Sequence, residues 1–381
     1  MSQVVKLLQE LVSIPSVNPD GDPGCPAEQT GEEELADFIA GTLSAQGFQI
    51  ILEEIRPGRP NLIARAPGSD DRPRIFFGPH SDTVGVGGMT IDPFGAEIQD
   101  DRLWGRGASD TKGPMAAMLW GLLENSDLLA ELPVAVDFVA FMGEESSQHG
   151  SRHFAQHHAE SYEFALVGEP TSLDFVHVTK GSVWATLTAT GRAAHSSQPE
   201  RGENAILKLG RALDFLNRKY SARLATFNHP ILGHATFNVG TFSGGTRANI
   251  VPDHAQAQID IRTVPELTTG GGALQHLEDF IAENQLPVEI VSPHENPPME
   301  VPIDHLWMQR LSRLCPESNP VGAPWFSDAA HLCAVGLPAI CVGPGSIDQA
   351  HTADEFIALE DLENGARFFS SLVRGLADTG H

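Results

Sequence analysis

A short run in the first half of the chain decides the fold class: Arg74-Ile75-Phe76-Phe77-Gly78, followed by Pro79-His80-Ser81-Asp82. A brief apolar run bounded by glycine and proline is typical of a buried strand. Similar runs alternate with helical patterns up to about residue 178, which predicts an α/β domain with a mixed, mostly parallel sheet flanked by helices. We expect strands over residues 48–54, 61–66, 74–78, 134–142 and 164–168, and helices over residues 2–12, 32–46, 112–124 and 151–158.

The hydrophobic pattern of the sequence changes after Gly181, where residues 182–190 alternate apolar and polar side chains. A period of two is typical of a half-exposed strand. This strand begins a predicted βαββαβ series: a helix over 204–219, strands over 235–242 and 255–263, a helix over 272–283 and a strand over 288–291. That order predicts a small ferredoxin-like α+β module.

A proline-rich stretch follows, and we interpret residues 293–298 as the linker that leaves the module. The α/β pattern then resumes with a helix over 305–314, a strand over 339–342 and a helix over 360–376. We therefore expect one α/β domain over residues 1–179 and 293–381, interrupted by an inserted module over residues 180–292.

The composition argues against two classes of binding partner, nucleic acids and anionic membranes. The chain has 381 residues, 41% of them hydrophobic, and a formal net charge of -26 from 50 acidic and 24 basic residues. This charge repels nucleic acid and anionic membrane surfaces. The N-terminal residues resemble an amphipathic helix rather than a signal peptide, and no run approaches the roughly 18 apolar residues of a membrane span. We expect a cytoplasmic protein with reduced cysteines, because its cysteines show no CxxC spacing.

Five places in the α/β domain put histidine or acidic side chains beside glycine or after a predicted strand, where open α/β sheets bind their ligands. His80 and Asp82 stand at i and i+2, so they share a face if the strand geometry persists. Asp82 could then accept the second imidazole N–H of His80. Asp110 ends a glycine-bounded turn before a predicted helix, where an ordinary helix N-cap is the alternative.

Further acidic side chains follow two apolar runs. Glu144 and Glu145 come after residues 134–142, and Glu169 comes after the next predicted strand. Adjacent carboxylates at a buried strand end repel each other unless a cation or a proton compensates. A solvated pair in a loop is the alternative. His351 stands in a later loop, and by itself it is more typical of an ordinary loop histidine.

The set as a whole predicts a two-metal site. Such a site needs imidazoles, terminal carboxylates and one carboxylate able to bridge ions about 3.5 to 4 Å apart. Two divalent ions carry four positive charges, which Asp110, Glu145, Glu169 and a bridging hydroxide would balance.

In their order and spacing, these motifs resemble those of the M20 metallopeptidase family, in particular its acetylornithine deacetylase and succinyl-diaminopimelate desuccinylase branch. The resemblance covers nearly the whole chain, including the position of the inserted module. It implies two divalent metal ions, zinc or else cobalt, held by five ligands: His80 and Glu169 on one ion, Glu145 and His351 on the other, and Asp110 bridging them.

The resemblance also implies two catalytic carboxyl groups. Asp82 would orient His80, and Glu144 would be the general base that takes a proton from the attacking water and passes it to the leaving amine. A glutamate at position 169 is typical of the family's deacylases and carboxypeptidases, whereas its aminopeptidases usually carry aspartate. The sequence departs from the family pattern at Thr111, where methionine is common, and this departure removes no ligand.

The inserted module looks like the family's dimerisation lid, which implies a homodimer. Its segment 191–197 matches the lid motif, in which His195 would reach the active site of the partner subunit and stabilise the oxyanion. A structural histidine on a polar loop is the alternative. Asn249 and Arg262 match substrate-binding positions, with Arg262 on the α-carboxylate of the substrate, although a surface arginine at a strand edge is the alternative.

The implied function is hydrolysis of the amide bond of an N-acyl-L-amino acid by a metal-activated water, as in amino-acid biosynthesis. Acetylornithine and succinyl-diaminopimelate are the expected types of substrate. The alternative among hydrolases is a metallocarboxypeptidase or dipeptidase acting on short peptides, because the loop over 325–329 leaves specificity open. A non-enzymatic binding dimer should lack the base or a ligand, but Glu144, His195 and all five ligand positions are present.

Overall fold

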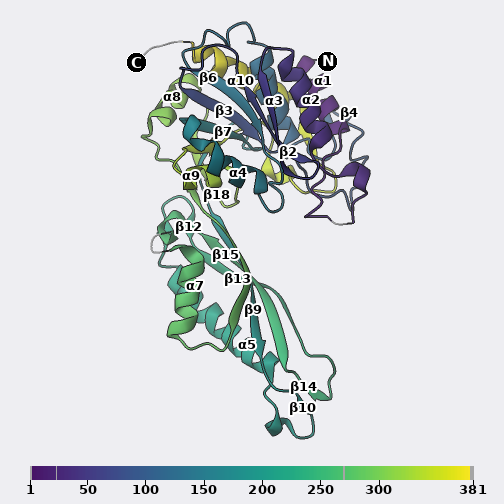
Figure 1. Cartoon of the computed structure of the whole chain (residues 1–381), viewed down its shortest axis with the longest axis vertical. Coiled ribbons are helices and arrows are strands. Elements are labelled where there is room, and N and C mark those ends of the chain that lie inside the picture. Colours follow the sequence, from purple (N-terminus) through teal and green to yellow (C-terminus); the bar gives the residue numbers. More distant parts are fainter. Residues whose placement is uncertain (1, 23, 269–270, 378–381) are drawn as a thin grey trace. The chain divides into compact units, whose positions relative to one another are not determined.

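The computed structural model describes residues 2–22, 24–268 and 271–377, and these divide into two compact units (Figure 1). Unit 1 comprises the described residues within Met1–His177, Val301–Val321 and Ser327–His381, and unit 2 those within Val178–Glu300 and Gly322–Phe326. The insert predicted over residues 180–292 falls inside unit 2, which continues on its C-terminal side to Glu300.

The core of unit 1 is a mixed sheet in which the strands follow the order β1-β2-β6-β3-β7-β19-β8. These strands are β1 (Gln49–Arg56), β2 (Arg59–Arg65), β3 (Arg74–Pro79), β6 (Ala135–Ala140), β7 (Phe164–Gly168), β8 (Phe175–Thr179) and β19 (Ala339–Cys341). Strand β3 runs parallel to β6 and β7, and β19 runs parallel to β7, whereas β1 and β2 extend the sheet by antiparallel pairing. The predicted α/β class with a parallel sheet centre is confirmed, and every residue of β3, β6 and β7 is buried.

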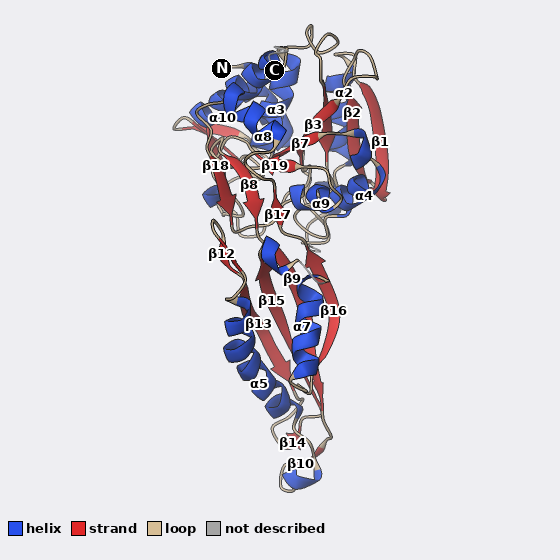
Figure 2. Cartoon of the chain, turned by 90° about the vertical axis from the view of Figure 1, so that its left-hand side faces the viewer, coloured by secondary structure: helices blue, strands red, loops and turns tan. Residues whose placement is uncertain are grey.

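Helices pack on both faces of this sheet: α1 (Gln3–Ser13), α2 (Glu33–Ser44), α3 (Lys112–Leu123), α4 (His149–His157), α8 (Leu306–Leu314), α9 (Ala329–Ala334) and α10 (Leu359–Gly375). Successive side chains of a strand point to opposite faces. Phe77 of β3 therefore joins the core formed with α1, α3 and α10, and its ring lies 5.1 Å from that of Phe369. The ring of Phe76 packs edge-on against Phe154 of α4, also at 5.1 Å. Figure 2 shows α3 and α10 on one side of β3 and β7, and α4 and α9 on the other.

A second, smaller sheet of unit 1 has the order β20-β5-β4 and was not predicted. Its strands are β4 (Glu97–Gln99), β5 (Arg102–Trp104) and β20 (Phe356–Ala358). Each has three residues, which is too short for an alternating pattern to be recognised in the sequence. Phe356 pairs with Trp104, and their rings lie 4.8 Å apart. This sheet joins the segment after His351 to the segment before Asp110.

Unit 2 contains a four-stranded antiparallel sheet with the order β13-β15-β9-β16. Along the chain its elements are β9 (Gly181–Thr190), α5 (Ala205–Phe215), β13 (Thr236–Gly244), β15 (His254–Thr263), α7 (Gly272–Glu283) and β16 (Glu289–Asn296), which is the predicted βαββαβ series. The helix predicted over 204–219 is α5 followed by a π-helical segment, Leu216–Tyr220, and α6 (Ser221–Leu224). Val183 and Leu187 of β9 are buried in the core of this unit, while Trp184 between them is half exposed.

The prediction of a linker over residues 293–298 is wrong for its first part. Strand β16 continues to Asn296, which pairs with Ser182 of β9. Proline is tolerated here because β16 is an edge strand, and the register of the pair shifts between Val291 and His294, on either side of Pro293. The chain then forms β17 (Met299–Glu300), and β18 (Pro320–Ala323) follows α8.

Shorter strands complete unit 2. A pair formed by β11 (Asn228–His229) and β12 (Gly233–His234) follows α6, and β10 (Ala194–His195) pairs with β14 (Ile250–Val251). Among the described residues, no helix combines the length and the apolar character that crossing a bilayer requires. All four cysteines lie within the described part of the chain and carry free thiols.

Candidate metal centre

The carboxyl ends of three neighbouring strands supply most of the predicted site residues. His80 follows β3, Glu144 and Glu145 follow β6 by a few residues, and Glu169 follows β7 directly. Because β3 lies between β6 and β7 and is parallel to both, these three chain segments leave the sheet at the same edge. The fold therefore brings together side chains that are far apart in the sequence.

The five predicted ligands fall into two groups that share Asp110. One group is His80, Asp110 and Glu169, the other is Asp110, Glu145 and His351, and in each group one ligand atom per residue lies within 4.8 Å of the others. The Nε2 atom of His80 lies 3.1 Å from Oδ1 of Asp110, and the Nε2 atom of His351 lies 3.5 Å from Oδ2 of the same carboxylate. The two oxygens of Asp110 thus face different imidazoles, as a carboxylate that bridges two ions requires.

The buried negative charge of this cluster favours the binding of cations. Burial and the neighbouring carboxylates raise the pKa of Glu144 and of Glu169 well above the usual range, and burial followed by the charge of Asp110 raises the pKa of Glu145 to about 7. The Oε1 atom of Glu145 is buried and makes no hydrogen bond to any described residue. Buried carboxylates of this kind are costly unless a cation compensates them, so the donor set of imidazoles and carboxylates fits two divalent ions.

Asp82 contacts both His80 and the segment that carries Glu144 and Glu145. The Nδ1–H of His80 donates to the backbone carbonyl of Asp82 at 2.9 Å, while the carboxylate of Asp82 lies further away, at 3.4 Å. That carboxylate instead accepts the backbone N–H groups of Glu144 at 2.9 Å and of Glu145 at 3.0 Å, and the side-chain amide of Asn18 at 2.7 Å. Asp82 therefore orients His80 through its main chain. Through its side chain it holds the loop that carries Glu144 and Glu145, here called the acidic loop, and the sequence pattern did not predict this second contact.

Asp110 is not a helix cap. The N-cap position of α3 is Thr111, and the peptide bond between Asp110 and Thr111 is cis. The hydroxyl of Thr111 donates to the backbone carbonyl of Gly168 at 2.7 Å. Thr111 thus ties the turn of Asp110 to the residue before Glu169.

Glu355 supports the turn of Asp110, and sequence reasoning did not identify it. Its side chain is fully buried and accepts the guanidinium of Arg106 at 2.7 Å. It also accepts the backbone N–H groups of Gly107, Ser109 and Asp110 at 3.1, 2.9 and 3.0 Å. The signal in the sequence was an acidic residue shortly after His351 and an arginine inside a glycine-bounded turn, but only the fold shows that the two segments meet.

Asp328 is a second carboxylate that sequence reasoning did not assign. It is fully buried, and burial raises its pKa to about 7. The hydroxyl of Ser151 donates to its Oδ1, whereas its Oδ2 makes no hydrogen bond to any described residue. Its charge contributes to the raised pKa values of Glu144 and Glu169, so Asp328 belongs to the electrostatic environment of the cluster.

The predicted lid residues lie in unit 2. His195 stands on β10, is exposed, and has its Nδ1 atom 2.7 Å from the hydroxyl of Ser197. Asn249 lies close by, because its backbone carbonyl accepts the N–H of Ser196 at 3.1 Å. Arg262 lies near the far end of β15 from these two, and its guanidinium pairs with the carboxylate of Asp260 at 3.0 Å. The structure therefore brings His195 and Asn249 together and leaves Arg262 apart from them.

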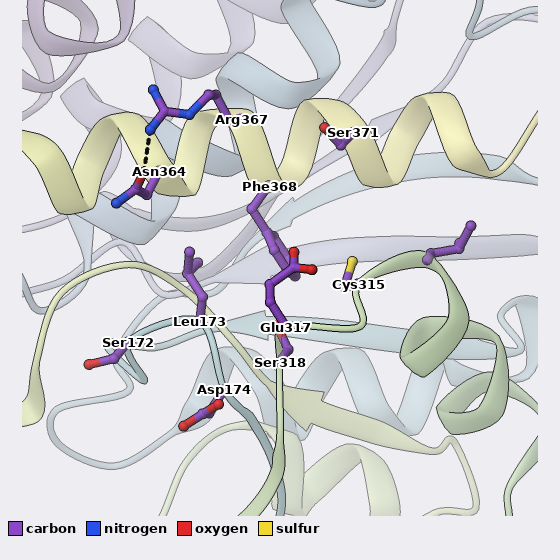
Figure 3. Close-up of a pocket in the computed structure, with 11 residues that line it drawn as sticks. Ser172, Leu173, Asp174, Cys315, Glu317, Ser318, Asn364, Arg367, Phe368 and Ser371 are labelled. Atoms are coloured by element: carbon purple, nitrogen blue, oxygen red, sulfur yellow. Dashed lines mark hydrogen bonds between the residues drawn. The ribbon is translucent and has the colours of Figure 1, made fainter.

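A pocket of about 400 Å³ lies in another part of unit 1 (Figure 3). Its wall includes Asn364 and Arg367 of α10, whose side chains are hydrogen bonded to each other. Leu173 and Phe368 supply apolar surface. The described residues that line this pocket include none of the predicted site residues, so the chemistry of the acidic cluster does not extend to it.

The sequence of the chain matches a known family over most of its length. The profile of Peptidase family M20/M25/M40 matches residues 76–375. An acetylornithine deacetylase of Proteus mirabilis (strain HI4320) is 31% identical over 386 residues, which cover 97% of this chain and 95% of the relative. An acetylornithine deacetylase of Vibrio cholerae serotype O1 (strain ATCC 39315 / El Tor Inaba N16961) is 32% identical over 355 residues, with coverage of 90% and 92%.

Solved structures share the fold at lower identity. An M20 family metallo-carboxypeptidase, Sso-CP2 from Sulfolobus solfataricus, has a TM-score of 0.77 and 18% identity, and the match covers 99% of this chain and 100% of that one. The YXEP protein of Bacillus subtilis, described as a dinuclear metal binding peptidase from the M20 family, has a TM-score of 0.68 and 15% identity, with coverage of 98% and 97%. These similarities show a shared fold that extends over both units.

Proposed function

The chain belongs to Peptidase family M20/M25/M40, and we propose that within this family of hydrolases it removes the acyl group from an N-acyl-L-amino acid. Acetylornithine is the first substrate to consider, because relatives that match almost the whole chain are acetylornithine deacetylases. Succinyl-diaminopimelate is the second, from the resemblance to the desuccinylase branch. We further propose a cytoplasmic enzyme that works as a homodimer, with its dimerisation lid in unit 2.

One observation carries the proposal of a two-metal site: the carboxylate of Asp110 belongs to both ligand groups and directs one oxygen to each. We propose that His80 and Glu169 complete the first metal site and that Glu145 and His351 complete the second. Zinc suits the mixed nitrogen and oxygen donors, and cobalt is the alternative. Two bound divalent ions would supply a nucleophilic water at neutral pH and polarise the scissile carbonyl.

In this proposal Glu144 moves the proton. Its carboxyl group takes a proton from the attacking water and later donates it to the amine that leaves, which requires a carboxyl group close to the reacting atoms and poorly solvated. The contact from the carboxylate of Asp82 to the backbone N–H of Glu144, at 2.9 Å, limits the movement of this loop. Burial raises the pKa of Glu144, which suits a group that must hold a proton between two steps.

His195 is the proposed oxyanion donor, supplied by the partner subunit. The contact between its Nδ1 atom and the hydroxyl of Ser197 restrains the ring, and Nε2 is the nitrogen that would donate to the oxyanion. Its exposure in a single chain is consistent with a residue that acts on another subunit. Asn249, next to it, and Arg262 are proposed to bind the substrate.

A hydrolysis screen tests this function. The purified protein would be supplied with zinc or cobalt and assayed on acetylornithine, succinyl-diaminopimelate, other N-acyl amino acids and short peptides. We expect release of an acyl acid from an N-acyl amino acid, and loss of roughly 10²- to 10⁴-fold in kcat in Glu144→Gln with its metal content unchanged. Glu160→Gln changes an exposed glutamate and serves as the control. Hydrolysis of peptides alone would favour the carboxypeptidase or dipeptidase alternative, and full activity in Glu144→Gln would contradict the role of that residue.

A further inference from the structure

A second group of metal-binding side chains lies on another part of unit 1. Glu53 stands on β1, an edge strand of the sheet, and His153 stands on α4, which packs against β1. His158 is the C-cap residue of the same helix. One ligand atom of each of the three residues lies within 4.8 Å of the others. None of them belongs to the candidate metal centre, and this inference does not depend on the proposed function.

The three side chains converge on one carboxylate. The Nε2 atom of His153 lies 3.0 Å from Oε1 of Glu53, and the Nε2 atom of His158 lies 3.0 Å from Oε2. Two ligand atoms on a tetrahedral zinc ion, each about 2.1 Å from the metal, are roughly 3.4 Å apart. The two nitrogen–oxygen distances are shorter than this by a few tenths of an ångström, so binding of one ion requires both distances to lengthen by that amount.

His153 presents a buried ring nitrogen to the carboxylate of Glu53. Its Nε2 atom has almost no solvent-exposed surface and lies 3.0 Å from Oε1 of Glu53, the oxygen with which it would share a cation. The ring is also held in place, because the ring of His157 stacks on it at 4.1 Å and at an angle of 17°. The Nδ1–H of His157 in turn donates to the backbone carbonyl of His153 at 2.8 Å. A nitrogen donor is thus presented in a restrained orientation.

The surroundings allow a cation to enter from solvent. The side chains of Glu53, His153 and His158 are 28%, 32% and 24% exposed, so the group lies at the surface and not in the core. The net charge of the chain, -26, attracts cations to that surface. Two imidazoles and one carboxylate form the His₂Glu ligand set that zinc accepts with a water in its fourth position.

We propose that Glu53, His153 and His158 bind a divalent cation of the zinc type and so join the end of α4 to the edge strand β1. The competing explanation is a pair of ion pairs, in which both imidazoles are protonated and share the carboxylate without any metal. The two explanations differ in what they predict for metal content. Helix α4 begins shortly after Glu145, so a cation at its C-terminal end would also restrain the helix that follows the acidic loop.

Metal content per chain tests the proposal. The full-length protein would be dialysed against micromolar zinc and then against metal-free buffer, and bound zinc would be measured by inductively coupled plasma mass spectrometry. We expect His158→Ala and Glu53→Gln each to hold one zinc ion per chain fewer than the unmodified protein. Glu54→Gln removes the same kind of charge from the exposed neighbouring residue on β1, outside the ligand group, and should keep the full content. Because Glu53→Gln preserves the size of the side chain, it keeps the test valid if an alanine variant folds poorly.

Equal zinc content in Glu53→Gln, His158→Ala and the unmodified protein would overturn the proposal and leave ion pairs as the explanation. Loss of zinc from Glu54→Gln to the same extent would also overturn it, because the effect would then follow from the loss of a surface charge and not from the ligands. Hydrolytic activity should be equal in all these variants, which separates this site from the candidate metal centre. A failure of the proposed function would leave the zinc count unaffected.

Discussion

Glu355 accepts the backbone N–H of Asp110 at 3.0 Å, so a buried carboxylate holds the main chain of the proposed bridging ligand. Replacing Glu355 by glutamine turns one of its two acceptor oxygens into a donor that faces backbone N–H groups. We expect metal affinity to fall by roughly 10- to 100-fold, as is usual when the support of a ligand is removed. Competition with a zinc chelator would measure the change.

The adjacent residue provides the control for that experiment. Asp354 is exposed, so Asp354→Asn removes the same kind of charge at nearly the same place in the chain. We expect it to leave the affinity for zinc unchanged. A Glu355→Gln variant with the affinity of Asp354→Asn would contradict the supporting role of Glu355.

Asp82 should affect both metal binding and turnover. Its carboxylate accepts three hydrogen bonds, from the main chain of Glu144 and Glu145 and from the side chain of Asn18. In Asp82→Asn at least one of these donors would face an NH₂ group, so the acidic loop should loosen. We expect a loss of roughly 10- to 100-fold in metal affinity, measured by chelator competition, together with a lower kcat at saturating metal. Unchanged kcat and affinity would show that the loop does not depend on Asp82.

A buried ion pair between Arg59 and Glu32 predicts a stability effect. Arg59 donates twice to the carboxylate of Glu32, both times at 2.7 Å, and both side chains are buried. Arg59→Met would leave that carboxylate without its partner, and we expect a loss of about 3–5 kcal/mol in the free energy of unfolding, measured with urea. Glu32→Gln in the same chain should recover part of the loss. Asp214→Asn, which breaks an exposed pair with Arg218, should cost less than about 1 kcal/mol and serves as the control.

The effect of Arg59→Met should depend on pH. Burial raises the pKa of Glu32 in the folded protein to about 7, above the value of 4.5 for an unperturbed glutamate. The folded state therefore holds a proton that the unfolded state releases, and stability falls as the pH rises through this interval. Without Arg59 the ionised carboxylate is less well compensated, so the loss should be larger above pH 7 than below it. A loss that does not change with pH would contradict this explanation.

Removal of metal should abolish hydrolysis reversibly. Dialysis against a chelator should reduce the rate on the best substrate of the screen to background, and added zinc or cobalt should restore it, because both ions suit a mixed site of imidazoles and carboxylates. The activity regained should saturate at two ions per chain bound to the candidate metal centre. Full activity in a chelated sample that contains no measurable metal would exclude a metal-dependent mechanism.

Much of the fold could be predicted because its signals are local. The bounds of β7 and α7 agree with the predicted ranges, and the alternation in β9 identified the sheet of unit 2. The predicted site residues at strand ends are brought together for a physical reason, since the carboxyl ends of adjacent parallel strands meet at one edge of the sheet. That rule follows from the prediction of a parallel α/β sheet, which the alternation of strands and helices in the sequence supports.

What could not be predicted depends on contacts between distant segments. Glu355 lies 245 residues after Asp110, and nothing near it in the sequence indicates that it accepts that backbone N–H. Asp328 is buried beside the acidic cluster, but its neighbours in the sequence do not show which element it packs against. The edge-strand position that tolerates Pro293 also becomes visible only once the order of the strands in unit 2 is known. Such features arise from the assembled fold.

The central claim, that Asp110 bridges two metal ions, is tested most directly by anomalous diffraction from crystals of the zinc-loaded protein. In the candidate metal centre we predict two zinc peaks about 3.5 to 4 Å apart, one next to His80 and Glu169, the other next to Glu145 and His351, with one oxygen of Asp110 on each. A single peak in this centre, or two peaks there of which only one contacts Asp110, would contradict the account.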